Sequence, residues 1–132
     1  MDRMIHVVGA VAFRGDKVFL ARRAPHKTMA YKWEFPGGKV ELGETEAEAL
    51  SREIDEELSV GLKIFSLLDS SVTFVGDLTI SLSTFLCEFV GEPQVSSDHD
   101  EMGWFDFDEL EALDIAEPDF PALVKLRDLM NG

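Results

Sequence analysis

Residues 37–60, GGKVELGETEAEALSREIDEELSV, decide the fold, because a glycine-rich loop leads there into a carboxylate-rich helix. Thr45 and Glu48 have the spacing of a capping box, in which each side chain satisfies a free backbone N–H at the start of a helix. Apolar residues then recur every three or four positions, and this spacing predicts one buried helical face. The residues of this face are Ala47, Leu50, Ile54 and Leu58.

Three carboxylates of this helix share a face beside the apolar one. Glu53, Glu56 and Glu57 fall together on a helix with 3.6 residues per turn, and like charges at this spacing cost about 0.2–0.5 kcal/mol per pair. The macrodipole also disfavours anions near the helix C-terminus. A solvated acidic face is one interpretation. The neighbouring Gly-Gly-Lys loop, and Arg52, which can hold a carboxylate bidentately, favour a site for a hard divalent cation instead.

Eight residues of this stretch match a long, multi-position signature. The pattern resembles G-x5-E-x7-R-E-U-x-E-E-x-G-U of the Nudix hydrolases, where U is a bulky apolar residue. The matching residues are Gly38, Glu44, Arg52, Glu53, Ile54, Glu56, Glu57 and Val60. One position departs, since Ser59 stands where the family has a glycine that ends the helix in a left-handed conformation. We expect Gly61, two residues later, to end the helix instead.

The composition indicates one folded domain, residues 1–132, with a strong negative charge. The chain is 45% hydrophobic with ten phenylalanines, which is enough for one core and too apolar for disorder. The net charge of −14 argues against a nucleic-acid polymer as partner, but not against a small phosphorylated substrate whose charge is carried by metal ions. The lone Cys87 excludes a disulfide framework. With neither a signal peptide nor a membrane-spanning apolar run, a cytoplasmic protein is expected.

The remaining chain alternates strand-like and helical segments. Strands are predicted at residues 5–13, 18–21, 62–75, 78–90 and 102–107. The first is expected to be buried on both faces. The third and fourth should form an antiparallel hairpin around Gly76 and Asp77, with a half-buried period-two pattern in the second arm. Further helices are predicted at 108–113 and from Asp119 to Met130, with Met130 facing inward. These elements favour an α/β fold, an α/β/α sandwich with a mixed β-sheet.

Within the Nudix family, nearly the whole chain resembles the MutT-like branch. This resemblance implies the Nudix fold and hydrolysis of a nucleoside triphosphate to the monophosphate and pyrophosphate, with Mg2+ or Mn2+. It also implies that Arg23 lies near the nucleotide and that Asp119 reads the base edge. Asp119 could also cap the helix that follows, and capping need not exclude contact with the base, so the base-reading role is favoured. The run EFPGGK is implied to line the substrate through Glu34, Phe35, Pro36, Gly37, Gly38 and Lys39. For Phe35, an ordinary core position is the alternative.

The resemblance further implies the residues of the hydrolytic end. The implied metal ligands are Glu53, Glu56, Glu57, Asp98 and the carbonyl of Gly37. Asp98 stands where the family has a glutamate and is one methylene shorter, so Glu101 is a reserve candidate. His99 is interpreted as a hydrogen-bonding loop residue rather than a catalytic base. A carboxylate, Glu53 or Asp98, would take the proton of the attacking water, and we favour Glu53, oriented by Arg52.

The preferred base stays open at this point. An ionised Asp119 only accepts hydrogen bonds, which suits the N4 amine of cytosine or the N7–H and N2 amine of 8-oxoguanine, whereas a protonated one would widen the choice. Two other Nudix specificities are less well supported. Enzymes that act on ADP-ribose are expected to have a proline that residues 61–92 lack, and enzymes that act on diadenosine polyphosphates are expected to have a tyrosine nearby, whereas Tyr31 is the only tyrosine. A catalytically silent nucleotide sensor is the alternative from another class. Ribose against deoxyribose, the number of metals, and monomer against homodimer also stay open.

Overall fold

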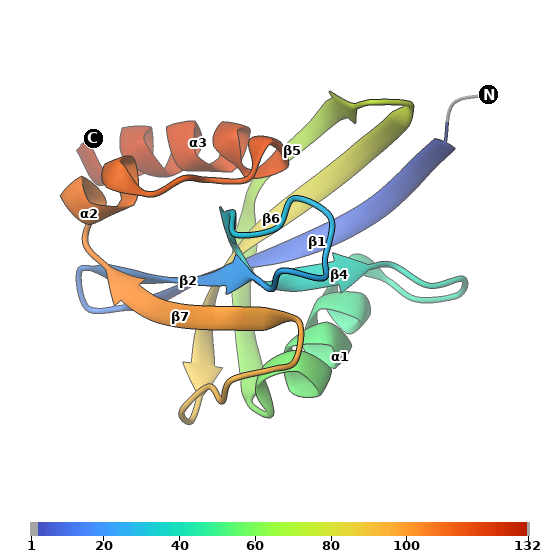
Figure 1. The fold of residues 1–132 in the computed structure, drawn as a ribbon. Coiled ribbons are helices and arrows are strands. Elements are labelled where there is room, and N and C mark those ends of the chain that lie inside the picture. The colour runs from blue at the N-terminus through green and yellow to red at the C-terminus, as the bar shows by residue number, and fades with distance from the viewer. Residues whose placement is uncertain (1–2, 132) are drawn as a thin grey trace.

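The computed structural model describes residues 3–131 and contains a mixed β-sheet flanked by helices (Figure 1). Its elements are β1 (Arg3–Arg14), β2 (Lys17–Arg23), β3 (Trp33–Glu34), β4 (Gly37–Lys39), α1 (Glu46–Leu58), β5 (Gly61–Val75), β6 (Leu78–Val90), β7 (His99–Phe105), α2 (Phe107–Ala112), the 3-10 turn η1 (Glu117–Asp119) and α3 (Phe120–Asn131). Every predicted strand and helix is therefore present, with shifts at the ends.

Strand β1 forms the centre of the sheet. The strand order is β3-β2-β1-β6-β5, while β4 pairs with β1 and β7 pairs with β2. β1 and β6 run parallel, from the pair Arg3–Leu78 to the pair Ala12–Cys87. The other strand pairs are antiparallel, including the predicted β5–β6 hairpin. The sheet is mixed because β6 returns beside the first strand of the chain.

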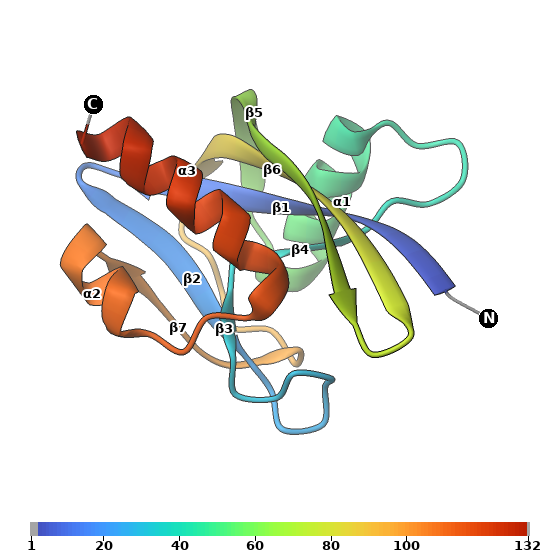
Figure 2. The same ribbon diagram turned by 90° about the horizontal axis from the view of Figure 1, so that it is seen from above.

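Each face of the sheet carries its own core, because side chains alternate along a strand. Under α1, Val8 and Ala10 of β1 pack with Phe19 of β2, whereas Val11 and Leu20 face the helices on the other side. Figure 2 shows α1 and α3 on opposite sides of the sheet. The predicted α/β/α sandwich with a mixed sheet is thus confirmed.

Helix α1 begins as its sequence predicts. Thr45 Oγ1 accepts from Glu48 N–H at 3.1 Å, and Thr45 N–H donates to Glu48 Oε1 at 2.9 Å, so the capping box is complete. The helix buries Ala49, Leu50, Ile54 and Leu58. Ala47 is exposed, contrary to prediction, because the buried face begins only after the first helical turn.

The end of α1 differs from the prediction. Ser59 itself adopts the left-handed conformation, with φ 53° and ψ 42°, and its N–H donates to Asp55 O at 3.0 Å. Gly61 belongs to β5 and does not end the helix. The serine therefore occupies the conformation for which the family signature has glycine.

Three further expectations were wrong in detail. β6 is covered on both faces over much of its length, because it lies between β1 and β5 with packed layers on either side, and Thr79 and Ser83 are buried. Phe107 opens α2 rather than closing the last strand, since Asp106 caps the helix together with Glu109. Met130 is exposed.

In the described part of the chain, no helix has the length and apolarity needed to cross a membrane.

Candidate active site

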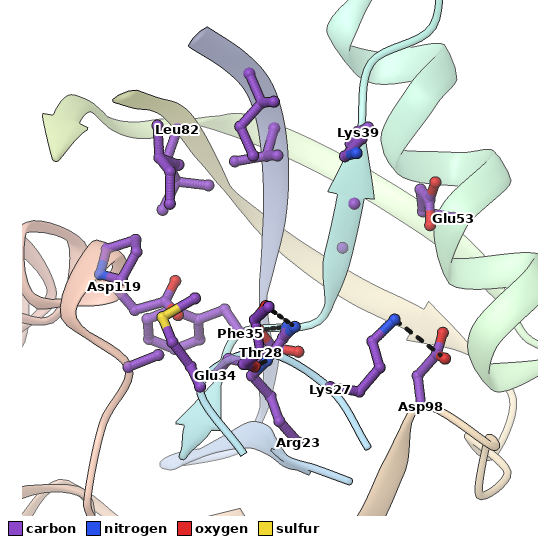
Figure 3. Close-up of a pocket in the computed structure, with 18 of the residues that line it drawn as sticks. Arg23, Lys27, Thr28, Glu34, Phe35, Lys39, Glu53, Leu82, Asp98 and Asp119 are labelled. Carbon is purple, nitrogen blue, oxygen red and sulfur yellow. Dashed lines mark hydrogen bonds and ion pairs between the residues drawn. The ribbon is translucent and has the colours of Figure 1, made fainter. Parts of the chain in front are cut away.

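A cavity of about 660 Å3 lies between the sheet, α1, and the loop that joins β2 to β3 (Figure 3). Ten residues predicted to act at the site line it: Arg23, Glu34, Phe35, Gly37, Gly38, Lys39, Glu53, Glu57, Asp98 and Asp119. Pro36, Arg52 and Glu56 do not. Figure 3 shows two ends, with Glu53 and Asp98 at one and Asp119 and Leu82 at the other. We call these the acidic end and the apolar end.

Two glycines let the backbone approach closely at the acidic end. A Cβ added to Gly37 would lie 1.9 Å from Val8 O, and one added to Gly38 would lie 2.3 Å from the Glu53 carboxylate. In the β1–β4 ladder, Ala10 N–H donates to Pro36 O. Hydrogen-bonded pairs alternate in such a ladder, so Gly37 opposite Gly9 occupies a non-hydrogen-bonded position. Pairing with β1 therefore leaves the Gly37 carbonyl available.

Arg52 holds the carboxylates of α1 from outside the cavity. Its guanidinium donates to Glu44 at 2.7 and 3.0 Å, to Glu53 Oε1 at 2.9 Å and to Glu56 Oε2 at 3.2 Å. It also donates to Lys39 O at 3.0 Å, which joins the helix to β4. The arginine lowers the pKa of Glu44. Arg52 thereby orients Glu53 toward the cavity, while Glu56 stays on the exposed side of the helix.

Two carboxylates of the acidic end have raised pKa values. Burial raises the pKa of Glu53, and the hydrogen bond from Arg52 opposes this. Burial is also the largest cause for Glu57, followed by the nearby charges of Glu34, Glu53 and Asp98, and together they raise its pKa to about 9. Its Oε2 is buried and has no hydrogen-bond partner among the described residues. The carboxylates therefore repel one another, and one oxygen of Glu57 is free to accept a further interaction.

This donor set fits a hard divalent cation. Across residues 3–131, no three His, Cys, Asp or Glu side chains are already gathered as a metal-binding cluster. The available donors are carboxylate and carbonyl oxygens, which are the ligands that Mg2+ prefers. The orphaned oxygen of Glu57 lies among them.

The loop before β7 brings Asp98 to the acidic end. Asp98 O accepts from Ala24 N–H at 3.0 Å, and Asp98 N–H donates to Ser96 Oγ at 3.2 Å. The Asp98 carboxylate lies 3.5 Å from the ammonium of Lys27, on the loop that joins β2 to β3. Glu101, the reserve candidate, is exposed and instead lies 3.5 Å from Arg22. Asp98 is therefore the acid that this segment contributes to the cavity.

A chain of hydrogen bonds runs from Arg23 to Ser96. Arg23 donates to Glu34 Oε1 at 2.9 Å, and the other oxygen of Glu34 lies 2.9 Å from His99 Nε2. His99 Nδ1 in turn lies 3.0 Å from Ser96 Oγ, and the imidazole is buried. His99 is thus a hydrogen-bonding residue, as expected, but in β7 rather than in a loop.

A β-bulge produces this arrangement. The β2–β7 register shifts between Arg22 and Arg23, so that Arg22 faces Glu101 and Arg23 faces His99. Asp100, between them, pairs with Arg22 on the outer side at 2.8 and 3.0 Å. Bulges re-aim side chains in this way and often lie next to active sites. The shift directs His99 inward to Glu34.

The apolar end of the cavity is lined by buried side chains. Phe35 is 4% exposed and Asp119 is 5% exposed. Burial raises the pKa of Asp119 well above its ordinary value, and the charge of Glu34 adds to this, while Arg23 and the Phe35 backbone oppose it. Sequence reasoning missed the apolar wall of this end, although the residues share one face of β1 and β6 at period-two spacing. They are Ile5, Val7, Leu78, Ile80 and Leu82.

Residues 4–126 match the family model of the NUDIX domain. The chain belongs to the Nudix family. It is 34% identical to the 8-oxo-dGTP diphosphatase of Escherichia coli K12, covering 98% of this chain and all of that protein. It is equally 34% identical to the CTP pyrophosphohydrolase of the same strain, covering 92% of this chain and 90% of that one. These relatives place it in the MutT-like branch and make it a Nudix hydrolase.

Solved structures agree with this assignment. The solution structure of the E. coli ORF135 protein matches with a TM-score of 0.85 and 32% identity, over 98% of this chain and 92% of that chain. The crystal structure of a MutT NUDIX hydrolase from Burkholderia pseudomallei matches with a TM-score of 0.86 and 29% identity, over 94% and 98%. The Nudix fold therefore extends over almost the whole described chain.

Proposed function

We propose that this Nudix hydrolase is a metal-dependent nucleoside triphosphate pyrophosphohydrolase, which converts NTP and water to NMP and pyrophosphate. One observation carries the proposal: a single cavity joins the acidic end, where Oε2 of Glu57 has no partner among the described residues, to an apolar end with the buried Phe35 and Asp119. A nucleotide has the matching polarity, with a charged triphosphate and an aromatic base. The names of the E. coli relatives support the same class of substrate.

The acidic end would act on the phosphates. In the proposal, the metal ligands are Glu53, Glu56, Glu57, Asp98 and the Gly37 carbonyl. Mg2+ or Mn2+ held there supplies positive charge to the triphosphate and lowers the pKa of bound water. Glu56 would have to turn from Arg52 toward the cavity, since its side chain is now on the exposed side. Lys39 and Gly38 would line the path of the phosphates.

Glu53 takes the proton of the attacking water in this proposal. Its carboxylate lines the cavity, and Arg52 fixes the Oε1 atom at 2.9 Å, so that Oε2 is left for the water. Arg52 is then a positioning residue, because it does not line the cavity itself. Asp98 is the alternative base. Its carboxylate is 40% exposed and paired with Lys27, which makes it the less oriented of the two.

Asp119 and Phe35 would hold the base, with Arg23 beside them. Burial raises the pKa of Asp119 well above its usual value and so favours the neutral carboxyl, which both donates and accepts a hydrogen bond. This pair of groups complements O6 and N7–H of 8-oxoguanine, and equally N3 and the N4 amine of cytosine. At the same edge, unmodified guanine offers N7 without a proton. We therefore keep 8-oxo-dGTP and (d)CTP-type nucleotides as the two substrate classes.

Removal of such nucleotides would protect DNA synthesis from damaged or unwanted precursors. We accordingly propose a role in nucleotide-pool sanitation, in the cytoplasm. The alternative, a catalytically silent nucleotide sensor, gains no support from the site, since the carboxylates of the family signature are all retained.

Pyrophosphate release tests the proposal. The purified protein would be incubated with Mg2+ and, separately, 8-oxo-dGTP, dGTP, CTP, dCTP and 5-methyl-dCTP, with Glu53→Gln as the inactive control. We expect one base to be strongly preferred, and release to fall by about 100-fold or more in the variant. Nucleotide binding without release from any of the five would contradict the proposed reaction and favour the sensor.

A further inference from the structure

Lys27 places a positive charge at the acidic end of the cavity. Its Nζ atom lies 3.5 Å from Asp98 Oδ1, and both side chains line the cavity together with Glu53 and Glu57 (Figure 3). The ammonium therefore neutralises part of the negative charge at the place where a metal ion would bind.

The loop between β2 and β3 keeps Lys27 at this place. Lys27 N–H donates to Ala24 O at 3.1 Å, and Ala24 N–H donates to Asp98 O at 3.0 Å. The guanidinium of Arg23 donates to both the carbonyl and the hydroxyl of Thr28, the next residue along the loop. The backbone of Lys27 is thus tied to the Asp98 segment, independently of the ion pair between their side chains.

The ion pair is weak enough to exchange partners. The side chains of Lys27 and Asp98 are 36% and 40% exposed, so that water and salt screen the attraction between them. A divalent cation beside Asp98 repels the ammonium and takes over its neutralising role. The triphosphate then brings phosphate oxygens, which accept charge-assisted hydrogen bonds from lysine.

We propose that Lys27 is an internal counter-ion of the acidic end, which leaves Asp98 when metal binds and moves to the phosphate oxygens of the substrate. This inference rests on the proposed function and adds to it a residue that exchanges partners during binding. Two effects of opposite sign follow. Lys27 competes with a metal ion in the nucleotide-free protein, and it strengthens the binding of the nucleotide.

The test compares Lys27→Met and Lys27→Arg with Lys125→Met, which removes the same charge from the exposed side of α3, outside the cavity. Mn2+ binding to the nucleotide-free proteins would be measured by electron paramagnetic resonance. We expect Lys27→Met to bind Mn2+ about two- to fivefold more tightly and to raise KM for the triphosphate about tenfold. Lys27→Arg and Lys125→Met should stay near the wild-type values, and thermal unfolding would verify that each variant is folded.

The two readouts separate this inference from the proposed function. If Lys27→Met bound Mn2+ no more tightly than the wild type, or bound nucleotide equally well, the counter-ion role would be overturned. If the wild type hydrolysed no nucleotide, the proposed function would fail. The Mn2+ comparison, with equilibrium nucleotide binding in place of KM, would still decide the role of Lys27.

Discussion

Gly38 lies directly against the carboxylate of Glu53. A Cβ on Gly38 would stand 2.3 Å from Cδ and from Oε2 of Glu53, well under the 3.0 Å that such contacts require. Glu53 has little freedom to move away, because Arg52 holds its Oε1 atom at 2.9 Å. Gly38 thus leaves free the space that the Glu53 carboxylate, our proposed general base, occupies.

Gly38→Ala should therefore impair catalysis more than folding. The added methyl group displaces Glu53, and a displacement of about 1 Å in an active site can cost about 100-fold in rate. We expect a loss of this order in kcat, measured as pyrophosphate release. Gly61→Ala is the matched control, because its Cβ would meet only Val90, at 3.4 Å. Wild-type activity in Gly38→Ala would show that the position of Glu53 is not critical.

Asp119→Asn should change how stability depends on pH. Burial raises the folded-state pKa of Asp119 well above 3.8. The stability that this shift contributes to the fold is therefore fully present below pH 3.8 and is lost as the pH rises through the raised pKa. Asparagine has the shape of the neutral acid and does not ionise. We expect urea unfolding at pH 5 and pH 9 to differ less for the variant than for the wild type. Asp128→Asn, an exposed change on α3, should keep the wild-type difference.

His99→Leu should weaken activity through Glu34. Leucine leaves Glu34 Oε2 without its donor, which costs about 1–3 kcal/mol of stability and frees the carboxylate that holds Arg23. We expect kcat/KM for the preferred nucleotide to fall about tenfold or more. His99→Gln should restore much of this, because its amide nitrogen can reach Glu34.

The recovery with glutamine distinguishes the hydrogen bond from simple packing. Asp100→Asn is the control, since it changes the outer partner of Arg22 at the same bulge. Equal losses in His99→Gln and His99→Leu would argue that the imidazole matters for its volume alone.

Ser59→Gly should stabilise the protein. Ser59 has φ 53°, and an L-residue in this left-handed region costs about 1–2 kcal/mol, part of which glycine removes. We expect the free energy of unfolding to rise by about 0.5–1 kcal/mol in urea titrations. Ser51→Gly, at an exposed position inside α1, should instead lower it by about 0.5 kcal/mol. A loss of stability in Ser59→Gly would mean that the serine side chain contributes more than its backbone strain costs.

Local signals in the sequence predicted most of the fold. The turn at Gly76 and the capping box of Thr45 each depend on neighbouring residues, and the structure reproduces them. The period-two alternation of residues 78–90 predicted the strand β6 but not the burial of both its faces. The prediction that Gly61 ends α1 was wrong. Ser59 ends the helix in a conformation that an isolated serine would avoid, because the chain turns there into β5. Propensity is a weak guide where tertiary structure determines the backbone.

Prediction of the site was limited by distance along the chain. The signature residues lie close together along the chain, and three of them, Gly38, Glu53 and Glu57, line the cavity. The contact between Glu34 and His99 joins residues 65 positions apart, and the bulge that aligns them leaves no local pattern. Nothing in the sequence around Lys27 distinguishes it from other polar loop residues. Its role emerges only when the fold brings Asp98 beside it.

The parallel pairing of β1 with β6 has a consequence for synthesis of the protein. β1 leaves the ribosome first, whereas its longest partner begins only at Leu78. Until then, β2 and β4 can pair with only parts of β1, and its apolar centre stays largely uncovered. Contacts between residues so far apart slow folding, and exposed apolar strands attract chaperones and aggregate. We therefore expect ribosome-bound nascent chains that stop before Val90 to be captured by chaperones through β1.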